Sequence, residues 1–407
     1  MEKGSLLSVP SIDYSQVELE LVAEPVGSIR NFEKVLKSEE KKTPVTSEGK
    51  AWTITHELDF EKLTKDDGTA YLLKYLEHRL CKTPVPETGQ KLEELFIRNQ
   101  NPTVVILWIK FVESLEPAIF EARDDDSPVT EKERSQLRGL LGALQWRCYN
   151  TAPQHAARLS LIQSEVNTAT IATVKAMNKL LREVQQQRQI SVKVNALHCP
   201  AEDVEFYGWC DAAVGNRKDY GSTGGYVIAA TTPGMDKGEN SPLTIVAWRS
   251  ARLPRVARSS LGAELQAMSE CEEELMFTRY QWGELLGMDI PPAEMTKALQ
   301  AVKGTLVTDA KSLYDVVKRG DLNSAGAGLK EKYSTLEFLS LLERLKTGRT
   351  AVRWVHSDAQ LADALTKPLA QGGSLNKVLC EHRWSVVFDP NYTSAKKRKG
   401  TEFKPKR

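Results

Sequence analysis

The sequence has no long hydrophobic run. Its longest apolar stretch, VVILWI at 104–109, falls well short of the roughly 20 apolar residues that a membrane-spanning helix needs. The N-terminal residues MEKGSLLSVPSIDYS likewise lack the long apolar core of a secretory signal peptide. We therefore expect a chain with no membrane segment.

Cysteine is scarce as well. The six cysteines lie scattered, with no Cys-x-x-Cys pair and no histidine at the spacing of a zinc knuckle. This usage argues against a zinc module and favours reduced thiols, which are typical of an intracellular protein. We expect a cytoplasmic or nuclear location.

A global excess of one charge is also absent, because the formal net charge is only +1. The end of the chain, KKRKGTEFKPKR, nevertheless carries seven basic residues against one acidic residue. A flexible cationic segment of this kind adds phosphate contacts to a nucleic-acid complex. Its first four residues are Lys396, Lys397, Arg398 and Lys399. A nuclear-import signal and a merely solvated end are alternatives that the sequence leaves open.

The chain divides into a mainly α-helical first half and a later α/β region. Its length suggests two or three structural units. Helical periodicity is present at 69–80, at 91–100 and over 134–188. From about residue 203, three short β-rich runs precede a helix, a strand, a helix, a strand and a last short helix. This order predicts one α/β domain with a mixed sheet.

These patterns also set the expected boundaries. We place a helical or irregular segment at 1–125, a helical region at 126–195, the α/β domain at 196–388 and a basic, disordered tail at 389–407. Polar, proline-containing stretches at 38–50 and 121–135 are typical of linkers or long loops.

The segment SSLGAELQAM at 259–268 predicts an amphipathic helix with one misplaced acid. Steps of four, seven and eleven from Glu264 reach Met268, Cys271 and Leu275, so its carboxylate lies on the stripe expected to face the core. An ionised carboxylate in such a place must be paired, bound to a cation or exposed in a cleft. An arginine of the preceding RVAR segment is one candidate partner.

Other acids offer a different explanation. Asp211 and Asp309 each end an expected strand, and Asp363 lies beside apolar residues on the last short helix. Since ligands of open α/β sheets gather where strands end, these acids and Glu264 are expected to converge. Four neighbouring carboxylates repel one another unless divalent cations neutralise them. Taken singly, an aspartate at a strand end is more often a turn or helix cap.

Mg²⁺ or Mn²⁺ suits such a set, because both prefer hard oxygen ligands. Two ions about 4 Å apart can activate a water and stabilise the leaving oxygen of a phosphodiester. The acids therefore indicate phosphodiester hydrolysis.

Several motifs follow one another between residues 208 and 369: GWCDAAVGN, STGGYVIAA, IVAWRSARLPRVARSSLGAELQAMSE, VTDAKSLYD and VRWVHSDAQLADALTKPL. In this order they resemble the ribonuclease H domain that closes the polyprotein of copia-type retrotransposons. The resemblance implies a five-stranded mixed sheet flanked by helices, two Mg²⁺ or Mn²⁺ ions, and hydrolysis of the RNA strand of RNA–DNA hybrids. It assigns the metal ligands to Asp211, Glu264, Asp309 and Asp363.

Some positions depart from the family pattern or extend it. Ala213 stands where the family commonly has a second acid, and Gly262 where another glutamate is frequent. His356 occupies roughly the place of a loop histidine that some ribonucleases H use in product release. A lone histidine at a strand end is more often structural.

The resemblance continues upstream more faintly. Residues 126–195 look like the connection between polymerase and ribonuclease H in the same elements, and residues 50–100 look like a helical gag-type segment. The aromatic-x-Asp-Asp hairpin of a polymerase is missing, because the aspartate pairs in TKDDGT and ARDDDSP lie in polar stretches. We expect no DNA synthesis by this chain, and a separate polymerase or gag-type chains as partners.

Candidate contacts to nucleic acid surround the acids. The 2′-hydroxyl distinguishes RNA from DNA, and Ser222, Thr223 and Asn216 are candidates to bind it. Ser259 or Ser260 is either another contact or a helix N-cap. Four arginines are candidates for phosphate contacts, or else form a solvated face: Arg249, Arg252, Arg255 and Arg258.

Two functions from different classes remain open. The four acids favour an active hybrid-specific ribonuclease. The missing polymerase favours a catalytically idle, retroelement-derived protein that binds nucleic acid or associates with itself. A transposase or integrase on the same fold is disfavoured, because those enzymes need Asp, Asp and Glu in that chain order.

Overall fold

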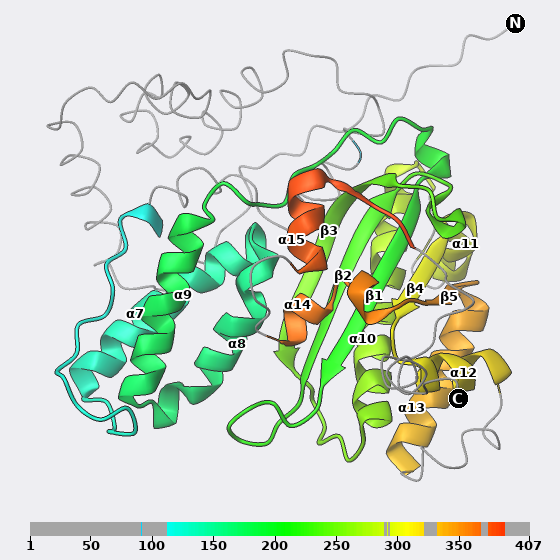
Figure 1. Ribbon diagram of the computed structural model, residues 1–407. Helices are drawn as coiled ribbons and strands as arrows, with labels where there is room; N and C mark the ends of the chain where they lie inside the picture. The colour runs from blue at the N-terminus through cyan, green and yellow to red at the C-terminus, as the bar shows by residue number, and fades with distance from the viewer. Residues whose placement is uncertain are drawn as a thin grey trace, which may run out of the picture. The chain divides into compact units, whose positions relative to one another are not determined.

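The computed structural model describes residues 91, 112–288, 291, 294–320, 332–367 and 373–386 (Figure 1). Of the gag-like segment expected at 1–125, only residues 91 and 112–125 are among them. The basic tail at 389–407, with Lys396 to Lys399, lies outside the described residues. Within these described ranges, no helix is both long and apolar enough to cross a membrane.

Among the described residues, helices α7 (Glu131–Asn150), α8 (Ala156–Glu165) and α9 (Ile171–Gln186) precede the sheet. Helix α7 begins with a capping box. The Thr130 hydroxyl accepts a hydrogen bond from the Glu133 backbone N–H at 3.3 Å, and Glu133 Oε2 accepts one from the Thr130 backbone N–H at 2.7 Å. These reciprocal bonds satisfy donors that have no partner within the helix. The three helices fall mainly within residues 134–188, where helical periodicity is expected, but the breaks between them are not predicted.

The sheet is mixed and has six strands in the order β5-β4-β1-β2-β3-β6. Strands β1, β2 and β3 pair antiparallel, whereas β4 joins β1 and β5 joins β4 in parallel. The strands are β1 (Glu205–Ala213), β2 (Thr223–Thr231), β3 (Ser241–Arg252), β4 (Gly304–Thr308), β5 (Ala351–Trp354) and β6 (Arg383–Trp384).

The expected mixed α/β sheet is thus confirmed, but the expected count of five strands is wrong. The sixth strand, β6, adds only two residue pairs to the edge of β3. Two residues are too few to leave a period-two pattern in a sequence.

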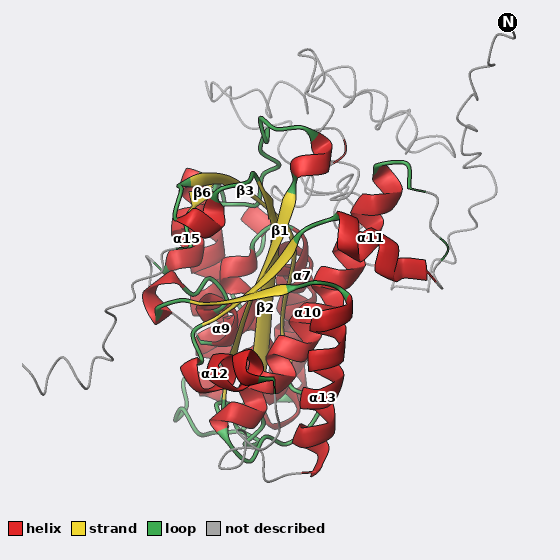
Figure 2. Ribbon diagram, turned by 90° about the vertical axis from the view of Figure 1, so that its right-hand side faces the viewer, coloured by secondary structure: helices red, strands yellow, loops and turns green. Residues whose placement is uncertain are grey.

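The other helices in the described part of the chain are α10 (Ser260–Leu285), α11 (Met295–Ala301), α12 (Lys311–Arg319), α13 (Lys332–Thr347), α14 (Asp363–Thr366) and α15 (Ser374–Glu381). The Ser259 hydroxyl accepts a hydrogen bond from the Gly262 backbone N–H at 3.1 Å, so Ser259 is the N-cap of α10. Figure 2 shows α10 and α13 side by side, and Arg344 of α13 donates to Glu272 of α10 at 2.8 Å.

Alternate residues of β1 face two different hydrophobic clusters. Phe206 and Cys210 pack with the apolar side of α10, whereas Tyr207 and Trp209 belong to a cluster that includes residues of α7, α8, α9 and α14. Successive side chains of a strand point to opposite faces of a sheet. Figure 1 shows α10 on one side of the sheet and α8 and α14 on the other. Asp211 lies on the same face of β1 as Tyr207 and Trp209, the face toward α14.

The helical region packs directly on the sheet. The Trp248 indole N–H of β3 donates to the Cys148 carbonyl of α7 at 2.9 Å. In the loop between β1 and β2, the buried Arg217 donates to the Ser160 carbonyl at 3.2 Å and to its hydroxyl at 2.7 Å. The helices and the sheet therefore share one core on this face.

Candidate metal centre

Three carboxylates from three different elements meet at one point. Asp211 lies on β1, Glu264 lies early in α10, and Asp309 directly follows β4. One carboxylate oxygen of each lies within 4.8 Å of the others. Because β1 and β4 are neighbouring parallel strands, the two aspartates come to the same edge of the sheet. Strand β1 runs on to Ala213, so it does not end at Asp211 as the sequence suggests.

Asp211 is buried opposite a glycine. Its register partner on β2 is Gly225, where a Cβ atom would lie only 2.7 Å from Leu365 Cβ. The missing side chain lets α14 lie close against the sheet. From α14, the Thr366 hydroxyl donates a hydrogen bond to Asp211 Oδ2.

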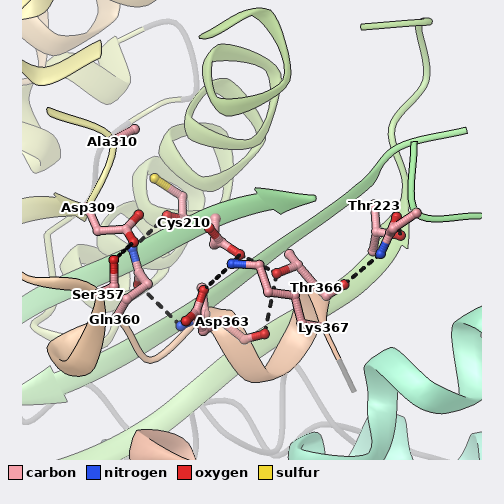
Figure 3. A network of polar contacts seen from close by, with 12 residues as sticks. Cys210, Thr223, Asp309, Ala310, Ser357, Gln360, Asp363, Thr366 and Lys367 are labelled. Carbon is pink, nitrogen blue, oxygen red and sulfur yellow. Dashed lines mark hydrogen bonds and ion pairs between the residues drawn. The ribbon is translucent and has the colours of Figure 1, made fainter. Parts of the chain in front are cut away.

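Residues of β5 and of the loop after it donate hydrogen bonds to Asp309. The Ser357 hydroxyl donates to Asp309 Oδ2 at 2.7 Å (Figure 3), and the Trp354 indole N–H donates to the Asp309 backbone carbonyl at 3.0 Å. These bonds fix both the backbone and the carboxylate of Asp309. One carboxylate oxygen is thereby turned toward Ser357.

Glu264 lies on the core-facing stripe of α10, as its spacing predicts. The residues at steps of four, seven and eleven from it are fully buried. Its Oε2 atom is shielded from solvent and has no hydrogen-bond partner. The Arg255 guanidinium binds Glu337 of α13 instead of this acid. A buried oxygen without a donor calls for an explanation, and a bound cation is one that suits an acid.

Burial raises the pKa of two of these acids. The pKa of Asp211 rises to about 7, chiefly because burial disfavours the charged form, while Lys367 and Thr366 oppose the rise. Burial, and then the charges of Asp211 and Asp309, raise the pKa of Glu264 well above its usual value. A divalent cation bound here would relieve this repulsion.

The fourth expected acid, Asp363, lies beside the cluster. Its Oδ1 is 2.6 Å from the Lys367 ammonium, which is also 3.3 Å from Asp211 Oδ2 (Figure 3). Asp363 opens α14 and Lys367 follows its last residue, so their spacing of four brings them together. Although burial opposes it, the two carboxylates raise the pKa of Lys367. The LADALTK motif contains this lysine, but sequence reasoning assigned it no role.

Ser222 and Thr223, expected to contact nucleic acid, are buried. The Ser222 hydroxyl accepts from the Gly215 backbone N–H at 3.1 Å. The Thr223 hydroxyl donates to Asn216 Oδ1 at 2.8 Å and accepts from Arg217 Nε at 3.1 Å. Both hydroxyls are engaged inside the protein, so this placement corrects the expected contacts to a 2′-hydroxyl.

These internal bonds lead to the acids. The Asn216 amide donates to the Thr366 backbone carbonyl at 2.8 Å, and Thr366 in turn binds Asp211. Because Arg217 also binds Ser160 of α8, a continuous chain of hydrogen bonds runs from the helical region to Asp211. Sequence reasoning missed this chain, because no local pattern shows that residues of the loop after β1, of α8 and of α14 will meet.

The four expected arginines are exposed on β3 and in the loop that follows it. We call these four residues the arginine row. Its last member, Arg258, is next to Ser259, the N-cap of α10, and α10 carries Glu264. Three of the four arginines pair with neighbouring acids: Arg249 with Glu270 at 3.6 Å, Arg252 with Asp219 at 2.6 Å, and Arg255 with Glu337. Their role as phosphate contacts stays a prediction.

His356 follows β5 and caps a short 3₁₀ helix, Ser357–Ala359. Its Nδ1 accepts a hydrogen bond from the Asp358 backbone N–H at 3.1 Å. The adjacent residue, Ser357, binds Asp309. His356 therefore lies one residue from a contact of the acid cluster, and its role in product release stays a prediction.

The donor set fits a divalent cation. Carboxylate oxygens are the ligands that Mg²⁺ and Mn²⁺ prefer, and the oxygens of Asp211, Glu264 and Asp309 are close enough to share one ion. Asp363 has a cationic partner already in Lys367. The described residues thus provide a place for a metal ion at the first three acids.

Neither a family model nor a curated protein matches the chain. A solved structure, the crystal structure of native prototype foamy virus protease–reverse transcriptase, is similar to it with a TM-score of 0.25 and 12% sequence identity. The similarity covers 46% of this chain and 20% of the viral chain.

Proposed function

We propose that this protein is a metal-dependent endonuclease that hydrolyses the RNA strand of RNA–DNA hybrids, with a ribonuclease H-like domain of copia-type retrotransposon origin. The observation that carries the proposal is the convergence of Asp211, Glu264 and Asp309 at one edge of a mixed sheet. Three antiparallel strands extended by two parallel ones also fit the five-stranded sheet that the motif resemblance implies, with β6 as an addition.

The roles of the residues follow from their contacts. Mg²⁺ or Mn²⁺ bound here supplies Lewis acidity and lowers the pKa of a coordinated water. Asp211, Glu264 and Asp309 are suited to hold the metal, since each presents an oxygen to the same point. The Thr366 and Ser357 hydroxyls orient the two aspartates by hydrogen bonds. Such outer partners fix the direction of a ligand before the metal binds.

The arginine row on β3 and its following loop supports a nucleic-acid substrate. Exposed cations at this position would contact the phosphates of a strand that reaches the acids. Their present partners are exposed or partly exposed acids, and surface ion pairs of this kind are weak. Phosphate groups can therefore compete for the same guanidinium groups.

Hybrids must be made before they can be cleaved. Because the sequence contains no paired-aspartate polymerase hairpin, the proposal includes a polymerase on a separate chain. Gag-type chains are the second class of partner that the proposal includes.

The test is a cleavage assay with the purified full-length chain. Labelled RNA–DNA hybrid, RNA duplex and DNA duplex are incubated in Mg²⁺ or Mn²⁺, with a chelator as the blank. We expect cleavage of the RNA strand of the hybrid alone, with 5′-phosphate and 3′-hydroxyl ends. A folded chain that leaves the hybrid intact at millimolar Mn²⁺ contradicts the proposal and favours an idle nucleic-acid-binding protein.

A further inference from the structure

We infer that Lys367 takes the place of one of the two divalent ions, so that the site holds a single metal ion with a tethered ammonium beside it. This inference rests on the proposed function, because it concerns how the same acids hold their cation. The structure divides the four carboxylates between two places. Three of them meet within 4.8 Å, and the fourth, Asp363, binds the lysine.

The Lys367 ammonium lies between Asp363 and the cluster of three acids. It is 2.6 Å from Asp363 Oδ1 and 3.3 Å from Asp211 Oδ2 (Figure 3). A second ion shared by Asp211 and Asp363 would compete with Lys367 for these two oxygens. The lysine and that ion therefore exclude each other, both by position and by charge repulsion.

The backbone that carries Lys367 is anchored on both sides of the cluster. Its N–H donates to the Asp363 carbonyl at 3.0 Å, and the preceding carbonyl, that of Thr366, accepts from the Asn216 amide at 2.8 Å. The Thr366 hydroxyl also binds Asp211. The backbone of Lys367 is thus held in place by hydrogen bonds.

The charge of the ammonium stands in for part of the charge that a second ion would supply. With four ionised carboxylates, one divalent ion and the ammonium leave a single negative charge, and two divalent ions without the ammonium leave none. The count of bound ions therefore distinguishes the two arrangements. The ammonium has three donors, two of which its acids use. The third remains for an oxygen of the phosphodiester, since the Lys367 side chain is 44% exposed.

The test counts bound Mn²⁺ in the full chain by calorimetry and by electron paramagnetic resonance. We expect one ion in the wild type and two in Lys367→Gln, where Asp363 and Asp211 are free to bind another. Two ions about 4 Å apart give a spin-coupled spectrum that one ion cannot give. Lys367→Arg keeps the charge and should hold one ion.

The matched control is Lys311→Gln, which breaks a similar pair with Asp315 on α12, also at a spacing of four and at 2.8 Å. It should bind one ion like the wild type. Two ions in the wild type overturn the inference, and so does a folded Lys367→Gln that binds only one. Should Lys367→Gln fail to fold, the wild-type count decides alone. Absence of any bound Mn²⁺ in the wild type would instead remove the metal centre and the proposed function with it.

Discussion

Asn216 and Thr366 lie 150 residues apart, and the Asn216 amide donates a hydrogen bond to the Thr366 carbonyl at 2.8 Å. This bond ties the loop after β1 to α14, the helix whose Thr366 hydroxyl binds Asp211. The acids are therefore positioned by a network that extends beyond their own elements.

Asn216→Ala should weaken Mn²⁺ binding by less than the roughly 10–100-fold typical for loss of a group bonded to a ligand, because Asn216 acts on Asp211 only through Thr366. Isothermal titration measures the change. The control is Asn195→Ala, which removes an amide bond to the Leu243 carbonyl at 2.6 Å on β3. Equal losses of affinity in both variants would assign the effect to general destabilisation.

Gly225→Ala should destabilise the fold by about 1–3 kcal/mol, the usual cost of overpacking. The new Cβ would lie 2.7 Å from Leu365 Cβ and would push α14 from the sheet. Urea unfolding measures the free energy. Gly142→Ala in α7 is the control, since a Cβ there meets nothing within 4 Å. It should stabilise by about 0.5–1 kcal/mol, because alanine is the better helix residue. A neutral Gly225→Ala would show that α14 does not need this close approach.

The sequence predicts the fold well wherever hydrophobic periodicity is long. The three strands before α10, the strand–helix pairs after it and the inward face of Glu264 all follow from local patterns. The elements α11, α15 and β6 escape prediction because each is short and, unlike α14, no motif marks it.

The site was harder to predict than the fold. The two aspartates at neighbouring strands and Glu264 on its stripe are local signals, and they meet as expected. The contact between Lys367 and Asp211 depends on long-range packing, since the lysine reaches Asp211 only when α14 is docked on the sheet. The sequence suggested that Thr223 contacts nucleic acid at the surface. In the structure its hydroxyl bonds to Arg217 and Asn216 inside the protein, and no sequence pattern indicates these partners.

Stability should depend on acid pH through Glu133. The pKa of this carboxyl is lowered from 4.5 to about 2, first by the Thr130 backbone N–H and then by Arg123. A lowered pKa means that the native state binds fewer protons, so this stabilisation is complete above the unfolded pKa and is lost as pH falls toward about 2. Glu133→Ala should therefore cost about 1 kcal/mol at pH 7, the typical size of one lost hydrogen bond.

Urea unfolding at a series of pH values measures this difference, which should shrink steadily below pH 4.5. The control is Glu131→Ala in the same first turn, where the acid makes an exposed pair with Arg134. Its effect should be small at every pH. A Glu133→Ala difference that stays constant with pH would rule out the charge of Glu133 as its source.

The central claim is tested most directly by single-turnover cleavage of an RNA–DNA hybrid in Mn²⁺ by Glu264→Gln. The amide keeps the shape of the side chain but removes the charge that holds the metal. Since bound metal supplies several kcal/mol and each 1.4 kcal/mol is tenfold in rate, cleavage should fall by about 1,000-fold. The control is Glu272→Gln, a buried acid on the same helix that binds Arg344. It should cleave at the wild-type rate. A Glu264→Gln variant as fast as the wild type would contradict the account.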